Sequence, residues 1–160
     1  MLMHRGLVNL AHNQQRLYGA GPGKRVLAFA SISFDGATWE WLMALTSGAS
    51  LHVCPEDVRR SGPALSRYLV EQGITHAAIP PALLAQVPLE APYALDVLIV
   101  SGEACDEHLA WRWASRCRVC NSYGPSEATV AATHADVLPG EAITLGTPLA
   151  NVAVHVVGTG

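Results

Sequence analysis

Residues 121–129, with the sequence NSYGPSEAT, combine a stackable ring, a tight Gly-Pro turn, a hydroxyl and a carboxylate in one short segment. This set suits a nucleotide, because Tyr123 offers a flat face to a base, Ser126 a hydroxyl to a phosphate oxygen, and Glu127 a ligand to a hard cation. A capped turn with a solvated glutamate explains the same residues without any ligand. Taken alone, the segment leaves a nucleotide site and a plain turn open.

Residues 33–40, with the sequence SFDGATWE, hold a second group of this kind. Asp35 could cap the N-terminus of a helix, or it could lie in a cleft and pair with the ammonium group of a substrate, and the two roles do not exclude each other. Trp39 follows one helical turn later and therefore shares the face of Asp35. A carboxylate beside an indole suits a ligand that has an amino group and an apolar side chain.

The segments that must position these residues alternate between helical and extended patterns. Helices are predicted at residues 6–18, 37–47, 63–72 and 106–116, and strands at 26–30, 50–54, 75–79, 96–100 and 118–122, with further strand candidates at 130–134 and 152–157. Uninterrupted apolar strands between helices predict an α/β fold, a flavodoxin-like layered structure with a mostly parallel sheet flanked by helices.

Ligands bind such sheets beyond the carboxyl ends of the strands. Polar clusters at residues 31–36, 101–104 and 121–127 each follow a predicted strand directly. The cluster at 101–104 is a weak signal on its own, because small residues also form ordinary turns. Since three separate strand ends carry such clusters, we expect them to meet in one site.

Composition narrows the class of protein further. With 160 residues, of which 50% are hydrophobic and 14% charged, the chain is expected to form one domain with a sizeable core. A formal net charge of −3 favours neither nucleic acid nor an anionic membrane as a partner. No apolar run is long enough to span a bilayer, and the N-terminus does not look like a signal peptide, so the cytoplasm is the expected location.

Cysteines and histidines give weaker signals. Reduced, structural thiols are expected at Cys54, Cys105, Cys117 and Cys120, although the spacing of the last two would also fit a thiol redox protein. The seven histidines are scattered without the spacing of metal ligands, and we expect no metal site among them.

The spacing of Phe34-Asp35, of residues 101–104 (SGEA) and of residues 123–127 (YGPSE) resembles the amino-acid adenylation domains of nonribosomal peptide synthetases, which belong to the adenylate-forming enzymes. Residues 1–9, Pro80-Pro81 and residues 146–148 lie where that family has similar segments, so the resemblance covers essentially the whole chain. It implies a ligase that activates an amino acid with ATP and Mg²⁺ to an aminoacyl-AMP. The acyl group would then pass to the phosphopantetheine thiol of a peptidyl carrier protein, as in antibiotic biosynthesis.

The resemblance also implies roles for individual residues. Asp35 would bind the α-amino group of the substrate, within a selectivity pocket formed by Asp35, Gly36, Trp39, Ala78, Ile99, Ser101, Ser122, Val130 and Ala131. The nucleotide would lie against Gly102, Glu103, Ala104, Asn121, Tyr123, Gly124, Ser126 and Glu127, with Glu127 assisting Mg²⁺. Ser126 is threonine in the commoner family pattern, and the hydroxyl is retained. Because the pocket residues are mostly apolar or small and carry no second charge, we expect a bulky hydrophobic, phenylalanine-like or other aromatic substrate.

By the same resemblance, residues 1–160 are expected to be a single subdomain, the substrate-selecting centre of an adenylation domain. The family's phosphate loop would precede it and the C-terminal lid domain would follow it, so no catalytic residue is expected here and the isolated fragment should bind without turnover. A stand-alone flavodoxin-like module for a small molecule and a fragment of an acyl- or aryl-CoA ligase remain alternatives. Asp35 argues against the CoA ligase, since its substrates lack an α-amine.

Overall fold

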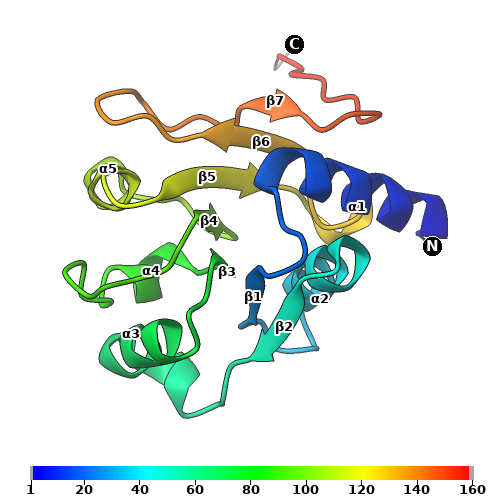
Figure 1. The fold of residues 1–160 in the computed structure, drawn as a ribbon. Helices are drawn as coiled ribbons and strands as arrows, with labels where there is room; N and C mark the ends of the chain where they lie inside the picture. The colour runs from blue at the N-terminus through cyan, green and yellow to red at the C-terminus, as the bar shows by residue number, and fades with distance from the viewer. Residues whose placement is uncertain (1, 159–160) are drawn as a thin grey trace.

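The computed structural model describes residues 2–158, which form a mixed α/β structure around one seven-stranded sheet (Figure 1). The strands are β1 (Arg25–Ala28), β2 (Ser50–Val53), β3 (His76–Ala78), β4 (Val97–Ser101), β5 (Arg118–Tyr123), β6 (Thr133–Asp136) and β7 (Thr147–Pro148), in the spatial order β2-β1-β3-β4-β5-β6-β7. Strands β1 to β5 pair in parallel, whereas β6 and β7 are antiparallel to their neighbours. The predicted fold class is therefore confirmed.

Helices cover both faces of this sheet (Figure 1). They are α1 (His4–Tyr18), α2 (Asp35–Ser47), α3 (Gly62–Glu71), α4 (Pro81–Leu84) and α5 (Glu107–Ala114), with single 3₁₀ turns η1 (Val58–Arg60) and η2 (Ser126–Ala128). In β4, Val97 and Ile99 belong to the core under α1 and α2, whereas Leu98 and Val100 belong to the core under α3 and α5. Successive side chains of a strand point to opposite faces, so an apolar run such as β4 must be buried on both sides.

The C-terminal part of the sheet departs from the predicted strands. The strand expected at 130–134 begins later, at Thr133, because Thr129 and Val130 adopt positive φ angles of 64° and 72° that no strand accommodates. The candidate at 152–157 is not a strand, and Val156 and Val157 are exposed. The last strand is instead β7 at Thr147–Pro148, which pairs with β6 and directly follows Gly146, whose φ angle of 74° is positive.

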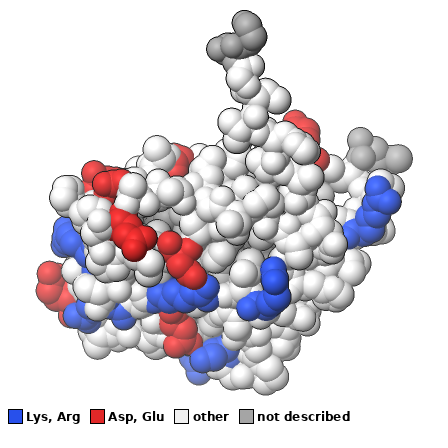
Figure 2. All heavy atoms as spheres, turned by 90° about the horizontal axis from the view of Figure 1, so that it is seen from above, with Lys and Arg blue, Asp and Glu red and all other residues white. Residues whose placement is uncertain are grey.

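Charged side chains of both signs are mixed on the face shown in Figure 2, and uncharged atoms cover most of it. Between residues 2 and 158, no helix combines the length and the apolar character that a membrane crossing requires.

We expect Leu98→Ala in the central strand β4 to lower the free energy of unfolding by about 2–5 kcal/mol, because it leaves a cavity in a fully buried site. The matched control is Leu45→Ala on α2, where the side chain is 65% exposed and the loss should stay within about 0.5 kcal/mol. Equilibrium urea unfolding compares the two variants. Equal unfolding midpoints would contradict the described core.

Candidate functional site

A cavity of about 930 Å³ opens at the carboxyl ends of β1, β3, β4 and β5. Its wall includes side chains from residues 31–36, 101–104 and 121–124, which come from the three polar clusters of the sequence. The clusters meet because parallel strands place their carboxyl ends along one edge of the sheet. This cavity is the candidate functional site.

All residues predicted to select the substrate lie along this cavity, namely Asp35, Gly36, Trp39, Ala78, Ile99, Ser101, Ser122, Val130 and Ala131. Of the residues predicted to hold the nucleotide, Gly102, Glu103, Ala104, Asn121, Tyr123 and Gly124 line it as well. Ser126 and Glu127 do not, since they lie in the exposed 3₁₀ turn η2 just beyond the end of β5.

Asp35 is the first helical residue of α2 and not its N-cap, so the capping interpretation is wrong. Phe34 is the N-cap, with extended dihedral angles, and the helix receives no side-chain cap. A carboxylate in the first turn is still favoured by the partial positive charge of the helix N-terminus. Asp35 therefore stands at the cavity with its carboxylate available to a partner outside the helix.

That partner in the folded chain is Ser126, whose Oγ donates a hydrogen bond of 2.5 Å to Oδ2 of Asp35. The contact joins the start of α2 to η2 across 91 positions of sequence. The residue predicted to bind an amino group and the residue predicted to contact phosphate are thus direct neighbours. A small ligand that carries both groups could reach both side chains.

The indole of Trp39 forms a rigid part of the cavity wall. It is 4% exposed and packs edge-on against Tyr18 of α1, with ring centroids 5.4 Å apart. An edge-to-face pair of this kind stabilises beyond the area that it buries. The ring is thereby held from behind, and its remaining surface faces the cavity.

The segment between β5 and β6 is held in a strained path. Thr129 and Val130 are β-branched, yet both have φ angles in the left-handed region, and Val130 lines the cavity. The N–H of Ala132 donates to the carbonyl of Tyr123 over 2.8 Å, which closes the loop. A Cβ at Gly124 would lie 2.5 Å from the Cα of Ala131, so the motif needs glycine at this close approach.

Two of the predicted nucleotide residues also hold loops of the cavity. Asn121 donates from Nδ2 to the carbonyl of Thr144 over 2.8 Å, and Oε1 of Glu103 accepts from the N–H of Ala82 over 2.8 Å. Tyr123 is 52% exposed, which leaves a face of its ring open to a ligand.

Glu40 is a cavity residue that the sequence analysis missed. Its side chain is 2% exposed, and both carboxylate oxygens accept from the N–H of Ala30, over 3.1 and 3.0 Å. Burial raises the pKa of this carboxyl to about 7, while the N–H groups of Ala30 and Phe29 and the charge of Arg59 act in the opposite direction. The sequence does contain a signal for Glu40, which is a single carboxylate inside the apolar helix segment TWEWLMAL. An acid in such a segment is unusual, because unpaired acids are rarely buried.

Beyond the nine residues predicted to select the substrate, the cavity is also lined by charged residues that were not predicted, namely Glu40, Arg59 and Glu107. Arg59 donates from Nε to the carbonyl of Cys54 over 3.0 Å. The other residues missed are Phe29, Ala30, Ile79, Pro80, Cys105, Ile143, Thr144 and Leu145. Most of them lie in the connections between helices and strands, and no local sequence pattern predicts which connections meet.

Comparison with known proteins identifies relatives of this chain. Residues 1–160 match the family described as "AMP-binding enzyme". The chain is 48% identical to chondramide synthase cmdD of Chondromyces crocatus over 112 residues, which are 70% of this chain and 3% of that protein. It is 33% identical to tyrocidine synthase 1 of Brevibacillus parabrevis over 161 residues, which are 98% of this chain and 15% of that protein. The chain thus spans a small share of the length of these relatives.

Solved structures show the same fold. A four-domain nonribosomal peptide synthetase bound to AMP and glycine, holo-AB3403, is 28% identical with a TM-score of 0.84, and the match covers 92% of this chain and 12% of that chain. The nonribosomal peptide synthetase FmoA3 bound to α-methyl-L-serine-AMP is 26% identical with a TM-score of 0.83, over 94% of this chain and 19% of that chain.

The buried carboxyl of Glu40 predicts a pH-dependent stability. The folded chain holds this proton up to about pH 7, whereas the unfolded chain releases it near the ordinary pKa of 4.5. The unfolded state therefore binds fewer protons in this window, and stability falls as the pH rises through it and levels off above it. Relative to Glu40→Gln, the wild type should lose on the order of 3 kcal/mol across the window.

Urea unfolding at a series of pH values from about 5 to about 8 measures this difference. The control is Glu71→Gln, at an exposed position near the end of α3, whose stability should follow the wild type at every pH. A constant difference between the wild type and Glu40→Gln across the series would show that Glu40 does not carry the proton.

Proposed function

Because the chain belongs to the AMP-binding enzyme family, we propose that it is the substrate-selecting part of an adenylation domain that activates an amino acid with ATP. The product would be an aminoacyl-AMP and pyrophosphate. The observation that carries this proposal is the 2.5 Å contact between Asp35 and Ser126 at the edge of the cavity. In an aminoacyl-AMP the amino nitrogen and the phosphorus are separated by only a few bonds, so an enzyme that forms it needs an amine anchor and a phosphate contact side by side.

Asp35 is assigned to the amino group. An ammonium ion entering the cavity would replace the Ser126 hydroxyl as the partner of the carboxylate, and a charge-assisted hydrogen bond is stronger than a neutral one. The freed hydroxyl of Ser126 could then donate to a phosphate oxygen. One exchange of partners would thus order both ends of the reacting group.

Tyr123 and Gly102 are assigned to the adenine. The Tyr123 ring is half exposed at the cavity, and Gly102 has no side chain and no atom within 4 Å of where a Cβ would stand. A flat base can therefore approach the backbone at Gly102 while it stacks against the ring. Glu103, Ala104, Asn121 and Gly124 complete this side of the cavity in the proposal.

Glu127 is the candidate ligand for Mg²⁺. Its carboxylate is exposed and directly follows Ser126, and oxygen ligands are the ones that this hard cation prefers. When bound together with ATP, the ion would offset negative charge on the phosphates. Ser126 and Glu127 would then act on neighbouring phosphate oxygens.

The substrate side chain is proposed to be bulky and hydrophobic, with an aromatic ring favoured. Trp39 and Ile99 provide apolar walls, and the small residues Ala78 and Ala131 leave room between them. The buried carboxyl of Glu40 is directed to the N–H of Ala30, and Arg59 donates to a carbonyl, so neither is free to select a charged side chain.

The proposal extends to the wider setting of the chain. The relatives named as synthases support a multidomain nonribosomal peptide synthetase, acting in the cytoplasm, that passes the acyl group to a phosphopantetheine thiol on a peptidyl carrier protein. The remaining segments of the adenylation domain would be the immediate partners of the chain.

We expect Asp35→Ala, in the full-length protein that carries this chain, to lower kcat/KM for the amino acid by roughly 10- to 150-fold, as the loss of a hydrogen bond to a charged group implies. The measurement is amino-acid-dependent exchange of pyrophosphate into ATP. Asp57→Ala, which removes an exposed carboxylate away from the cavity lining, is the control and should leave the exchange unchanged. Near-normal activity of Asp35→Ala would refute the assignment of the amine.

The same assay with each proteinogenic amino acid tests the substrate class. We expect phenylalanine or a similarly large apolar residue to exceed glycine, aspartate and lysine by at least about 10-fold in kcat/KM, since each buried methylene contributes roughly 1–3 kcal/mol of discrimination. Ala78→Phe should fill the pocket and shift the preference toward smaller residues. A preference for aspartate, lysine or glycine in the wild type would overturn the substrate class and leave the adenylation proposal standing. If none of the amino acids supports exchange, both the substrate class and the adenylation proposal would be overturned.

A further inference from the structure

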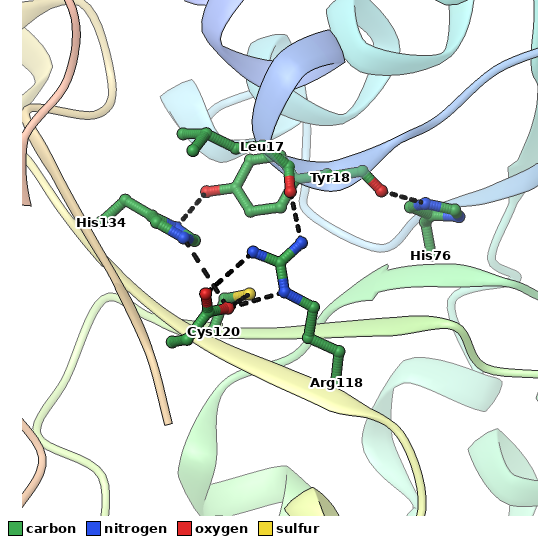
Figure 3. A network of polar contacts seen from close by, with 7 residues as sticks. Leu17, Tyr18, His76, Arg118, Cys120 and His134 are labelled. Atoms are coloured by element: carbon green, nitrogen blue, oxygen red, sulfur yellow. Dashed lines mark hydrogen bonds and ion pairs between the residues drawn. The ribbon is translucent and has the colours of Figure 1, made fainter. Parts of the chain in front are cut away.

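A second group of polar side chains lies away from the cavity, on the antiparallel pair β5–β6 (Figure 3). Cys120 is opposite Asp136 in the register of this pair, and Ser122 is opposite His134. Because alternate residues of a strand share a face, the side chains of Cys120, His134 and Asp136 all point to the same side of the sheet. That side is covered by the C-terminal end of α1, where Tyr18 packs against His134 with ring centroids 5.3 Å apart.

The possible ligand atoms of these residues are close together. Oδ1 of Asp136 lies 3.3 Å from Sγ of Cys120 and 3.9 Å from Nε2 of His134, and all three atoms lie within 4.8 Å of one another. A tetrahedral zinc ion holds sulfur, nitrogen and oxygen ligands roughly 3.3–3.6 Å apart. Among residues 2–158, these three side chains are the ones whose ligand atoms lie close enough together to hold an ion. Small movements would bring the distances between the ligand atoms to those of a zinc site.

The strongest sign of a missing partner is Nε2 of His134. This atom is buried and has no hydrogen-bond partner within the described residues, and the residue as a whole is only 9% exposed. The other ring nitrogen, Nδ1, lies 3.3 Å from the hydroxyl of Tyr18. If Nδ1–H donates to that oxygen, the lone pair of Nε2 faces Cys120 and Asp136. A buried polar atom without a partner costs free energy, and a bound ion would remove that cost.

Neighbouring groups orient the three residues through hydrogen bonds, as the hydrogen-bond partners of metal ligands do in metal sites. Arg118 donates from Nε to Oδ1 of Asp136 over 2.6 Å and from Nη2 to Oδ2 over 3.0 Å. The guanidinium also donates to the carbonyl of Leu17 at the end of α1 (Figure 3). A carboxylate oxygen has a further lone pair, so Oδ1 could bind an ion while it keeps its bond to Arg118.

We propose that Cys120, His134 and Asp136 form a binding site for a divalent transition-metal ion of the Zn²⁺ class, with water as a fourth ligand. Thiolate, imidazole and carboxylate are the ligand types that zinc takes in proteins. On binding, the Cys120 sulfur forms a bond to the ion and its proton passes to solvent, while His134 binds as the neutral imidazole and Asp136 as the carboxylate. The two negative ligands balance the charge of the ion.

The ion would join β5 to β6 under the end of α1. No local pattern indicates this site, because Cys120 and His134 are separated along the chain and become neighbours only through strand pairing. The expectation that no histidine belongs to a metal site is replaced by this proposal. It does not rest on the function proposed for the cavity.

Cobalt(II) tests the site directly, because a thiolate ligand gives an intense sulfur-to-cobalt charge-transfer absorption. We expect one such cobalt site in the full-length protein that carries this chain, lost in Cys120→Ser and retained in Cys117→Ser, the matched control at the neighbouring cysteine. Zinc should displace the cobalt. In competition with a chromophoric chelator, the dissociation constant for zinc should rise at least about 10-fold in Asp136→Asn, and far-UV circular dichroism checks that each variant is folded.

Two outcomes of the cobalt titration would overturn the proposal, and the first needs only the wild type. Absence of any sulfur-to-cobalt absorption, or an absorption that persists in folded Cys120→Ser, would contradict it. If Cys120→Ser does not fold, Asp136→Asn decides instead, because this half-exposed residue should tolerate the change. An unchanged zinc affinity in folded Asp136→Asn would then reject the ligand set.

Discussion

Strands β1, β3, β4 and β5 are parallel to one another, and helices cover both faces of their sheet. This constraint decides where polar side chains of a functional site can lie. Their middle residues must be apolar on both sides, as Val97 to Val100 are. Polar side chains that are not paired within the sheet are therefore left to the strand ends. At the carboxyl ends, the connections to the following helices bring together Asp35, Ser101 and Tyr123 from distant parts of the sequence.

The return of the chain after β5 completes the site and carries most of its strain. Gly124 lets the loop pass close to Ala131, and the positive φ angles of Thr129 and Val130 direct the chain back as β6. Such angles persist in β-branched residues only where surrounding contacts impose them. The Ser126–Asp35 bond and the Ala132–Tyr123 bond are contacts of this kind. The same loop thus presents a hydroxyl to Asp35 and closes the wall of the cavity.

Sequence patterns predicted the elements of the parallel sheet and the edge at which the site lies, because apolar periodicity and strand-end chemistry are local properties. They did not predict β7, which follows a close approach of Gly146 to the backbone of His134, nor the role of Phe34 as the N-cap of α2. Glu40 and Arg59 were missed because burial at the cavity is decided by the packing of α2 and η1, not by neighbours in sequence. The residues near Thr144 are held at the cavity by bonds to Asn121 and Glu107, which are distant in the sequence.

The two ends of β5 are linked through the end of α1. At the amino end, Arg118 binds the carbonyl of Leu17, and Nε2 of His76 lies 2.9 Å from the carbonyl of Tyr18, so two C-terminal carbonyls of the helix find partners on the sheet (Figure 3). This docking fixes the Tyr18 ring, which packs against His134 on one side and against Trp39 on the other. Trp39 is a wall of the cavity. Its position therefore depends, through Tyr18, on polar contacts made at the opposite end of the strand. A change in the network around Arg118 would therefore reach the cavity through packing.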